Sequence, residues 1–373
     1  GAYFRLMFIS IAIEMLNVVI LAVIRFRERS GLFVVLTAVR LALILLLTIY
    51  FVAFRAMGVE GIILAQVLGH LAALVLTIPL LIREMTLRLH RKALSGMLKF
   101  SAPLAVSGLA IVILNMGDRY ILKFLKGEAA VGIYTLAYKI GGLVNFFVAQ
   151  AFQMGFQPIA YKMYKEPGAG RFFSKVATYL VGGTTYASLF IALFAKEVLM
   201  LFSPKNPGYW LAFPYVPLIA LIFIINNLRF MFNQGLHFTK KTKFLPYLIG
   251  AGALVNIGLN FLFIPFLGIA GAAVSSLITA FLLALVVYRV SNRYYPVAYQ
   301  FKKVFMLVGL ATGLYATTLF LPQWPLWQVM GLKALLFLAY PVILFALGFY
   351  EPVELQRIGE AWHKWKRPSQ WKK

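Results

Sequence analysis

Long apolar segments recur along the whole chain, and they restrict the fold more than any other feature of the sequence. A helix needs about 20 apolar residues to cross the ~30 Å hydrocarbon layer of a bilayer. Strands are excluded, because the segments are too long and lack the alternation of barrel strands. The sequence therefore predicts an all-α, polytopic transmembrane helical bundle. The spans are expected at residues 6–24, 31–54, 59–82, 100–122, 131–153, 176–202, 211–236, 244–265, 268–289, 304–321 and 327–350.

Composition indicates a bilayer environment for nearly all of the chain. Hydrophobic residues make up 62% of the 373 residues and charged residues only 13%, whereas soluble domains carry about 25% charged residues. A formal charge of +25 would suggest nucleic acid in a soluble protein. In a membrane protein, however, basic residues gather in the cytoplasmic loops, so we expect no nucleic-acid partner. The absence of cysteine excludes disulfides and thiolate metal sites.

The basic residues alternate from one connection to the next. Every second connection, together with the C-terminal tail, is rich in Lys and Arg and holds 25 of them. The other connections hold four: Arg55, Lys123, Lys126 and Lys205. Because cytoplasmic loops are enriched in Lys and Arg, the sequence predicts a cytoplasmic C-terminus and places residue 1 outside.

Two short Gly-x-x-Gly turns indicate an internal repeat. Met57–Gly61 resembles Leu267–Gly271, and Arg25–Ser30 resembles His237–Thr242, at offsets of 210 and 212 residues. Two lobes with equivalent spans are typical of transporters. If the second lobe begins near residue 97, three spans of the first lobe precede Gly1. We therefore expect a chain that starts within a longer protein and contains eleven of fourteen spans.

This repeat predicts two pseudo-symmetric lobes followed by two C-terminal helices. The expected parts are a partial N-terminal lobe with a cytoplasmic linker (1–95), a six-helix C-terminal lobe (96–300), two additional transmembrane helices (301–350) and a basic cytoplasmic tail (351–373).

Charged residues inside the predicted spans mark candidate functional positions, because a charge at the bilayer centre costs at least ~2.5 kcal/mol on insertion scales. Asp118 and Arg119 lie near the outer end of span 100–122, where a local ion pair and a gate are both open interpretations. Lys139 lies inside the next span, with Gln153 at its end. Lys139 either lines a cavity or extends its stem to the interface.

Two further polar groups occupy spans of the two repeats. Arg229 shares a helical face with Asn226, and either a cavity lining or interhelical hydrogen bonding explains that stripe. In the earlier repeat Glu14 is either a proton or cation site or a structural partner of Arg40.

His70 is interpreted as a helix–helix hydrogen-bonding residue in preference to a switch. Asn256 and Asn260 are interpreted as packing contacts between helices, and Lys196 and Glu197 as an ordinary interfacial pair.

The charged residues inside the predicted spans are mainly cationic. Guanidinium and ammonium groups suit phosphate or carboxylate partners. Glu14 and Asp118 are predicted to bind a coupling ion or to form part of a gate. We expect no enzyme chemistry, no catalytic or metal site and no bound cofactor, because phosphate-loop and metal-binding motifs are missing from the sequence. Coupling to H⁺ or Na⁺ is left open. The residues predicted to bind an anionic substrate are Arg119, Lys139, Arg229, Arg40, Asn226 and Gln153.

Five stretches of the sequence carry a family resemblance: Phe100–Leu104, Gly117–Leu122, Val131–Ile140, Phe156–Pro158 and Asn260–Ala273. With them the chain resembles bacterial polysaccharide (O-antigen type) flippases of the multidrug/oligosaccharidyl-lipid/polysaccharide (MOP) exporter superfamily. Arg119 and Lys139 fall on the matching stretches. Arg229 and Arg40 come from the reasoning on charged residues alone.

The resemblance implies a transporter that moves undecaprenyl-diphosphate-linked oligosaccharide from the cytoplasmic to the outer leaflet by alternating access, for O-antigen and lipopolysaccharide synthesis. It further implies the cytoplasmic (inner) membrane of a bacterium or archaeon. The implied partners are the lipid-linked oligosaccharide, membrane lipids and polysaccharide polymerase machinery.

Two alternatives remain at this stage. A multidrug-type exporter of small molecules would be expected to carry buried acids, and only Glu14 qualifies. A membrane glycan polymerase or ligase would need a large outer loop, and the predicted outer loops are short.

Overall fold

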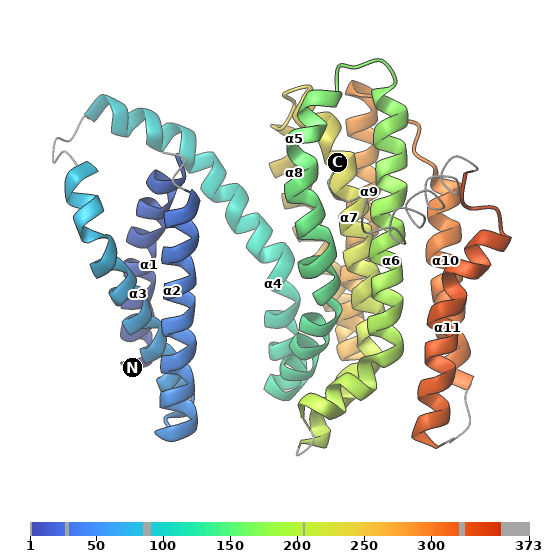
Figure 1. Ribbon diagram of the computed structural model, residues 1–373, viewed down its shortest axis with the longest axis horizontal. Helices are drawn as coiled ribbons and strands as arrows, with labels where there is room; N and C mark the ends of the chain where they lie inside the picture. The colour runs from blue at the N-terminus through green and yellow to red at the C-terminus, as the bar shows by residue number, and fades with distance from the viewer. Residues whose placement is uncertain (1, 27–29, 85–90, 204–205, 321–324, 352–373) are drawn as a thin grey trace, which may run out of the picture. The chain divides into compact units, whose positions relative to one another are not determined.

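The computed structural model describes residues 2–26, 30–84, 91–203, 206–320 and 325–351, and Figure 1 shows its helices. Apart from Glu351, the predicted basic tail (351–373) lies outside the described residues. The described part of the chain is helical and contains no strand, which confirms the all-α prediction. It divides into two compact units, Gly1–Met97 and Leu98–Lys373. The assignment of lobes and terminal helices to these units stays a prediction.

The first unit is built from three long helices. These are α1 (Ala2–Phe26), α2 (Ser30–Ile49), which continues into a π-helical turn η1 (Tyr50–Phe54), and α3 (Gly58–Glu84). Helix α3 contacts both α1 and α2. Its buried side is formed by small and branched residues such as Ala65 and Ala73.

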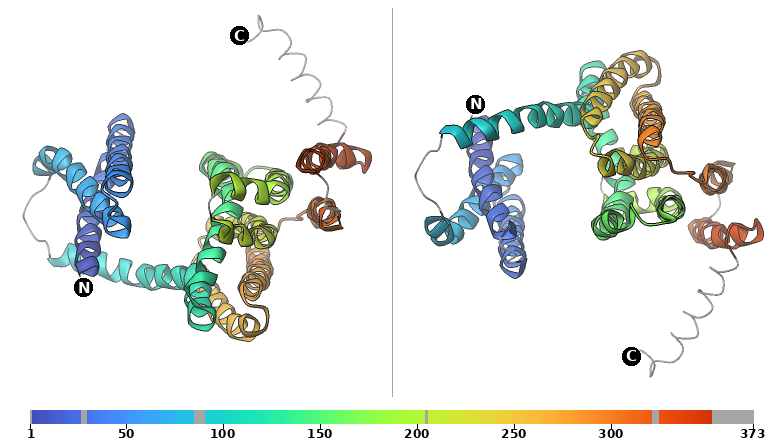
Figure 2. Two further views of the ribbon diagram at one scale, coloured as in Figure 1. Left: turned by 90° about the horizontal axis from the view of Figure 1, so that it is seen from below. Right: turned by 90° about the horizontal axis from the view of Figure 1, so that it is seen from above.

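The second unit contains the remaining helices. They are α4 (Arg91–Gly141), which begins in the first unit, η2 (Asn145–Gln150), α5 (Ala151–Met163), α6 (Ala169–Phe202), η3 (Pro207–Tyr215), α7 (Val216–Phe238), α8 (Phe244–Leu267), α9 (Ile269–Tyr294), α10 (Phe301–Thr317), η4 (Thr318–Phe320) and α11 (Leu326–Ala346). Figure 2 shows these helices end-on. Helix α9 packs against α7 and α8, α6 packs against α7, and α10 and α11 pack against α6.

The described helices include ten that are long and apolar enough to cross a membrane. One of these, Gly108–Met163, contains a break at Gly127, where φ is +84° and ψ 179°. Only glycine adopts such a conformation readily. The break separates the two spans predicted at 100–122 and 131–153, so the predicted eleven spans agree with the structure.

The two Gly-x-x-Gly turns have matching local geometry. Gly58 and Gly268, which begin the turns, both have φ of +57°. Gly61 and Gly271, three residues later, both lie where a side chain would collide. A Cβ at Gly61 would lie 2.9 Å from the Cβ of Phe51, and one at Gly271 would lie 2.6 Å from the backbone carbonyl carbon of Phe263. Glycine at both positions therefore permits a sharp turn followed by close helix packing.

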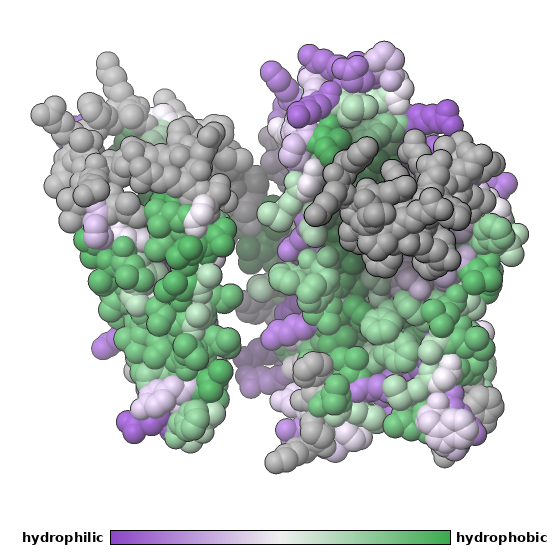
Figure 3. All heavy atoms as spheres, in the orientation of Figure 1, coloured by the Kyte–Doolittle hydropathy of each residue, from purple (hydrophilic) through white to green (hydrophobic). Residues whose placement is uncertain are grey.

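Apolar side chains cover most of the surface of each unit along its helices (Figure 3). Large side chains such as Phe8, Leu41, Phe124 and Phe266 are at least two-thirds exposed. A soluble protein rarely exposes apolar patches of this extent, whereas lipid tails solvate them. Together with the ten apolar helices, this surface identifies a multi-pass membrane protein.

Candidate functional site

The buried carboxylate of Asp118 lies at the centre of the polar interior of the second unit. The side chain is 2% exposed. Its Oδ1 accepts from the backbone N–H of Arg119 at 2.8 Å and from the guanidinium Nη1 of Arg119 at 3.2 Å. Its Oδ2 accepts from the hydroxyl of Tyr134 at 2.6 Å and from that of Ser276 at 3.3 Å. Four donors therefore satisfy a charge that hydrocarbon would otherwise exclude.

The break in α4 brings these residues together. After Gly127 the chain folds back, so that Tyr134 reaches Asp118. The Arg119 guanidinium lies over the rings of Tyr134 and Tyr138, at 5.4 and 4.4 Å from their centroids. The local ion pair considered from the sequence is thus present, with two aromatic rings that shield it from lipid.

Amide and hydroxyl side chains extend this network across α8 and α9. Asn256 donates to the hydroxyls of Ser276 (3.4 Å) and Thr279 (3.2 Å). Asn260 donates to the side-chain oxygen of Asn256 at 2.9 Å, and its own Oδ1 is buried without a hydrogen-bond partner. The interpretation of Asn256 as a helix–helix contact agrees with its bonds to α9, whereas the bonds from Asn260 to Asn256 lie within α8. The network gives Asp118 a polar, oxygen-rich surrounding.

The side chains of Arg229 on α7 and Asp118 on α4 line the same hollow. The hollow is lined by polar groups of four helices, among them Asn115, Asp118, Asn226, Arg229, Asn256 and Ser276. Arg229 donates through Nε and Nη2 to the side-chain oxygen of Asn226, at 3.3 and 3.0 Å. Within the described residues, no carboxylate pairs with Arg229. Two predicted substrate-binding residues, Arg229 and Asn226, therefore lie beside a predicted coupling residue.

The remaining predicted residues of this unit lie elsewhere. Gln153 donates to the side-chain oxygen of Asn227 at 3.3 Å, and neither of these residues lines the hollow. Lys139 is exposed on α4 and also lies outside the lining. Substrate binding by Lys139 and Gln153 stays a prediction.

Glu14 and Arg40 belong to the first unit, where they lie near His70. Glu14 Oε2 is 3.9 Å from His70 Nε2. Both Glu14 and Arg40 interact electrostatically with His70. In the described residues, Arg40 forms no salt bridge with Glu14, so the alternative of a direct Glu14–Arg40 pair is not observed. The backbone carbonyl of His70 accepts from Asn17 Nδ2 at 2.9 Å.

Sequence reasoning missed one charged pair inside the membrane. Lys333 of α11 donates to Glu197 of α6 at 2.6 Å, and the two side chains are 10% and 15% exposed. The interpretation of Lys196 and Glu197 as an interfacial pair is therefore wrong. Lys196 lies instead near the ring of Phe213. A lysine inside span 327–350, six residues after its start, was the available signal for this contact.

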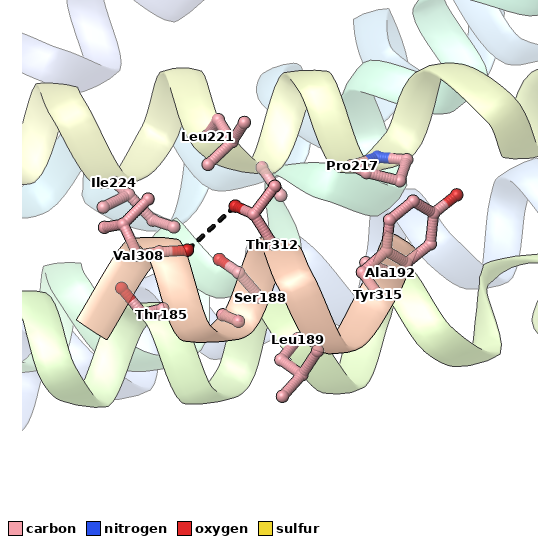
Figure 4. A pocket seen from close by; sticks show the side chains of 12 residues that line it. Thr185, Ser188, Leu189, Ala192, Pro217, Leu221, Ile224, Val308, Thr312 and Tyr315 are labelled. Atoms are coloured by element: carbon pink, nitrogen blue, oxygen red, sulfur yellow. Dashed lines mark hydrogen bonds between the residues drawn. The ribbon is translucent and has the colours of Figure 1, made fainter. Parts of the chain in front are cut away.

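A second hollow, between α6, α7 and α10, is mainly apolar (Figure 4). Leu189, Leu221 and Ile224 line it. The hydroxyls of Thr185 and Ser188 lie in the same wall and are buried without hydrogen-bond partners. Its lining contains no charged residue, so we place the candidate site in the polar hollow around Asp118 and Arg229. In the described part of the chain, no group of three His, Cys, Asp or Glu residues could hold a metal.

Comparison with known proteins shows which family model and which solved structures this chain resembles. A family model described as "Polysaccharide biosynthesis protein" matches residues 3–163. The solved structure of the lipid II flippase MurJ, in an inward closed conformation, superposes with a TM-score of 0.70 at 12% identity. That match covers 93% of this chain and 75% of MurJ. The chain has the fold of the MOP superfamily.

Other MOP structures show the same fold. An outward-facing multidrug resistance MATE family transporter matches with a TM-score of 0.59 and 18% identity over 78% of this chain and 68% of its own length. A MOP transporter from Pyrococcus furiosus, whose binding pocket is described as having reverse polarity, matches with a TM-score of 0.56 and 19% identity over the same shares. No curated protein sequence matches the chain. The fold implied by the resemblance of the five sequence stretches is confirmed.

Proposed function

We propose that this protein is a flippase that moves undecaprenyl-diphosphate-linked oligosaccharide from the cytoplasmic to the outer leaflet of the inner membrane by alternating access. The polysaccharide-biosynthesis family match and the likeness to a lipid II flippase support a carrier of lipid-linked glycan. The proposed protein does no bond chemistry. Its residues bind the headgroup and expose it to each side in turn.

The main support for this proposal is that no described carboxylate pairs with the guanidinium of Arg229. Its guanidinium lies in a polar hollow inside the membrane-spanning region, and its described hydrogen-bond partner is the neutral amide of Asn226. A cation held in a span without a carboxylate is costly. A diphosphate supplies the missing anion and matches the donor fork of a guanidinium.

Asp118 is proposed as the coupling residue of this unit. In the observed state its carboxylate neutralises Arg119. When Asp118 binds a proton or Na⁺, its attraction for Arg119 weakens, so Arg119 becomes available as a second ligand for the headgroup. Ion binding and substrate binding would then favour each other, as reciprocal linkage requires.

A leaflet-exchange measurement tests the function. The protein is reconstituted in liposomes with a fluorescent undecaprenyl-diphosphate oligosaccharide, and exchange is followed by quenching of the outer leaflet. A charged hydrogen bond contributes about 1.5–3 kcal/mol, so Arg229→Gln is expected to slow exchange by about 10- to 100-fold. The same assay tests Lys139→Gln. Lys302→Gln, an exposed lysine at the start of α10, is the control and is expected to match the wild type.

Two results would overturn the proposal. One is a wild type that leaves the lipid in its original leaflet, whether or not it exports a soluble compound. The other is an Arg229→Gln variant that exchanges the lipid at the wild-type rate, because the hollow would then have no part in transport.

A further inference from the structure

His70 lies at the meeting point of the three helices of the first unit. It is on α3 and is 7% exposed. Glu14 approaches from α1 at 3.9 Å, and the side chain of Arg40, on α2, interacts with His70 electrostatically. Among the described residues these are the charged groups that face the imidazole from α1 and α2. The neighbouring η1 turn, Tyr50–Phe54, contains no charged residue.

The hydrogen bonds of this cluster are incomplete. His70 Nδ1 and Arg40 Nη1 are both buried without a partner. Glu14, in contrast, has a side chain that is 48% exposed. Asn17 lies one turn further along α1. Its Nδ2 donates two hydrogen bonds, to Ile13 O at 3.2 Å and to His70 O at 2.9 Å. A buried polar atom without a partner is uncommon and costly. Two of them in one cluster therefore indicate a site that another group completes.

We propose that His70 binds a proton together with an anionic phosphate headgroup, and thereby makes the first unit a proton-linked anion site. The proposal rests on the proposed flippase function and deepens it by naming a proton as the coupling ion of this unit. His70 is the group that takes up the proton, Arg40 Nη1 is the free donor for the phosphate, and Glu14 stabilises the imidazolium.

The charges of the cluster explain the coupling. With a neutral imidazole, Glu14 and Arg40 cancel, and the cluster has no net charge. With an imidazolium the cluster carries one positive charge and a second buried donor, the N–H at Nδ1. Histidine is the side chain whose unperturbed titration lies nearest the physiological range, so within this cluster it is the residue suited to take up the proton. An anion therefore binds better when His70 is protonated, and by linkage the anion also strengthens proton binding.

The structural alternative is that His70 only packs α3 against α1. In that case its imidazole would remain in one protonation state, and a headgroup would not affect it. The carbonyl bond from Asn17 to His70 does not involve the imidazole, so it is compatible with either role.

Histidine NMR distinguishes the two roles. The full chain is labelled with ¹⁵N-histidine in nanodiscs. The His70 resonance is assigned by replacing the other three histidines (His90, His237 and His363) one at a time, which leaves the cluster intact. Its titration midpoint is measured with undecaprenyl diphosphate and with the uncharged alcohol undecaprenol. We expect His70 to titrate with a midpoint about one unit higher in the diphosphate lipid, equivalent to a tenfold linkage.

Two variants sharpen the experiment. Arg40→Gln is expected to abolish the difference between the two lipids, and Glu14→Gln is expected to lower the midpoint in both. A His70 resonance that does not titrate, or that has the same midpoint in both lipids, overturns the inference. The flippase function is judged separately, by lipid exchange. Exchange with a lipid-independent His70 would overturn the inference alone. A lipid-dependent His70 without exchange would support the inference and overturn the transport proposal.

Discussion

The carboxylate of Asp118 in the second unit accepts four hydrogen bonds. Tyr134, 0% exposed, contributes its shortest side-chain contact, 2.6 Å from oxygen to oxygen. Tyr138 contributes differently, because its ring face lies 4.4 Å from the Arg119 guanidinium. The two tyrosines therefore stabilise opposite members of one ion pair, one through its hydroxyl and the other through its ring.

This difference predicts the effect of removing each hydroxyl. Tyr134→Phe leaves a buried carboxylate with one donor fewer, so it should lower the free energy of unfolding by about 1.5–3 kcal/mol. Tyr138→Phe keeps the ring under Arg119 and should behave like the wild type. Thermal unfolding of the purified protein in detergent measures both. Equal midpoints for Tyr134→Phe and the wild type would contradict the role assigned to this hydroxyl.

For single residues, the sequence predicted contacts between residues close together in the chain better than contacts between different helices. The Asp118–Arg119 pair and the Asn226–Arg229 contact follow from adjacency or helical spacing. The Tyr134 contact depends on the fold-back at Gly127, and the Ser276 contact brings α9 against α4. Periodicity does not encode such a contact, because it identifies the face of a helix but not the helix that covers it.

Single contacts also connect whole elements, as α6 and α11 show. Lys333 and Glu197 join these helices through a 2.6 Å hydrogen bond in the membrane-spanning region. Immediately after α11, Glu351 accepts from Lys175 of α6 at 2.6 Å and lies 3.7 Å from Lys303 of α10. The bond from Lys175 lowers the pKa of Glu351. These three ionic contacts therefore hold α11 and the segment after it against the rest of their unit.

A double-mutant cycle tests the buried contact. Removing one partner of a buried ion pair leaves an uncompensated charge and typically costs 3–5 kcal/mol. Glu197→Gln and Lys333→Met should each lower the unfolding midpoint clearly. The double variant should recover most of the loss, because neither charge remains. The coupling is read from thermal unfolding of all four proteins. Additive losses in the double variant would show that the two residues stabilise the protein independently.

Helices and turns were predicted correctly where they are determined by the length of an apolar segment or by a backbone conformation that favours glycine. The spans follow from apolar length, and the turns at Gly58 and Gly268 follow from a conformation that favours glycine. The Glu197 interpretation failed because adjacency was taken for contact. Residues adjacent on a helix point in directions about 100° apart, so Lys196 and Glu197 face different neighbours.

At the scale of the whole molecule, two compact units share one kind of Gly-x-x-Gly turn, and each contains a polar cluster within an apolar exterior. The sequence predicted the membrane class, the helical fold and its likeness to MOP structures. The roles of all predicted site residues, including Arg40, Lys139 and Gln153, stay predictions. A charged residue in a span shows that a compensating group is needed, but the sequence alone does not show whether protein, water or substrate provides it.

On the two clusters together rests the proposal that this protein carries a diphosphate across the membrane on cationic side chains. Arg229 in one unit and Arg40 in the other each have a guanidinium that no described carboxylate neutralises through a salt bridge. A transported lipid should then be recognised by its charged headgroup and not by its tail.

The most direct test compares leaflet exchange of three fluorescent lipids with the same undecaprenyl tail and the same oligosaccharide, joined by a diphosphate, a monophosphate or an uncharged ether. We expect the fastest exchange for the diphosphate, slower exchange for the monophosphate and background exchange for the ether. We also expect Arg229→Gln to slow exchange of the diphosphate lipid and to leave that of the ether lipid unchanged. Equal exchange of all three lipids by the wild type would contradict the proposal.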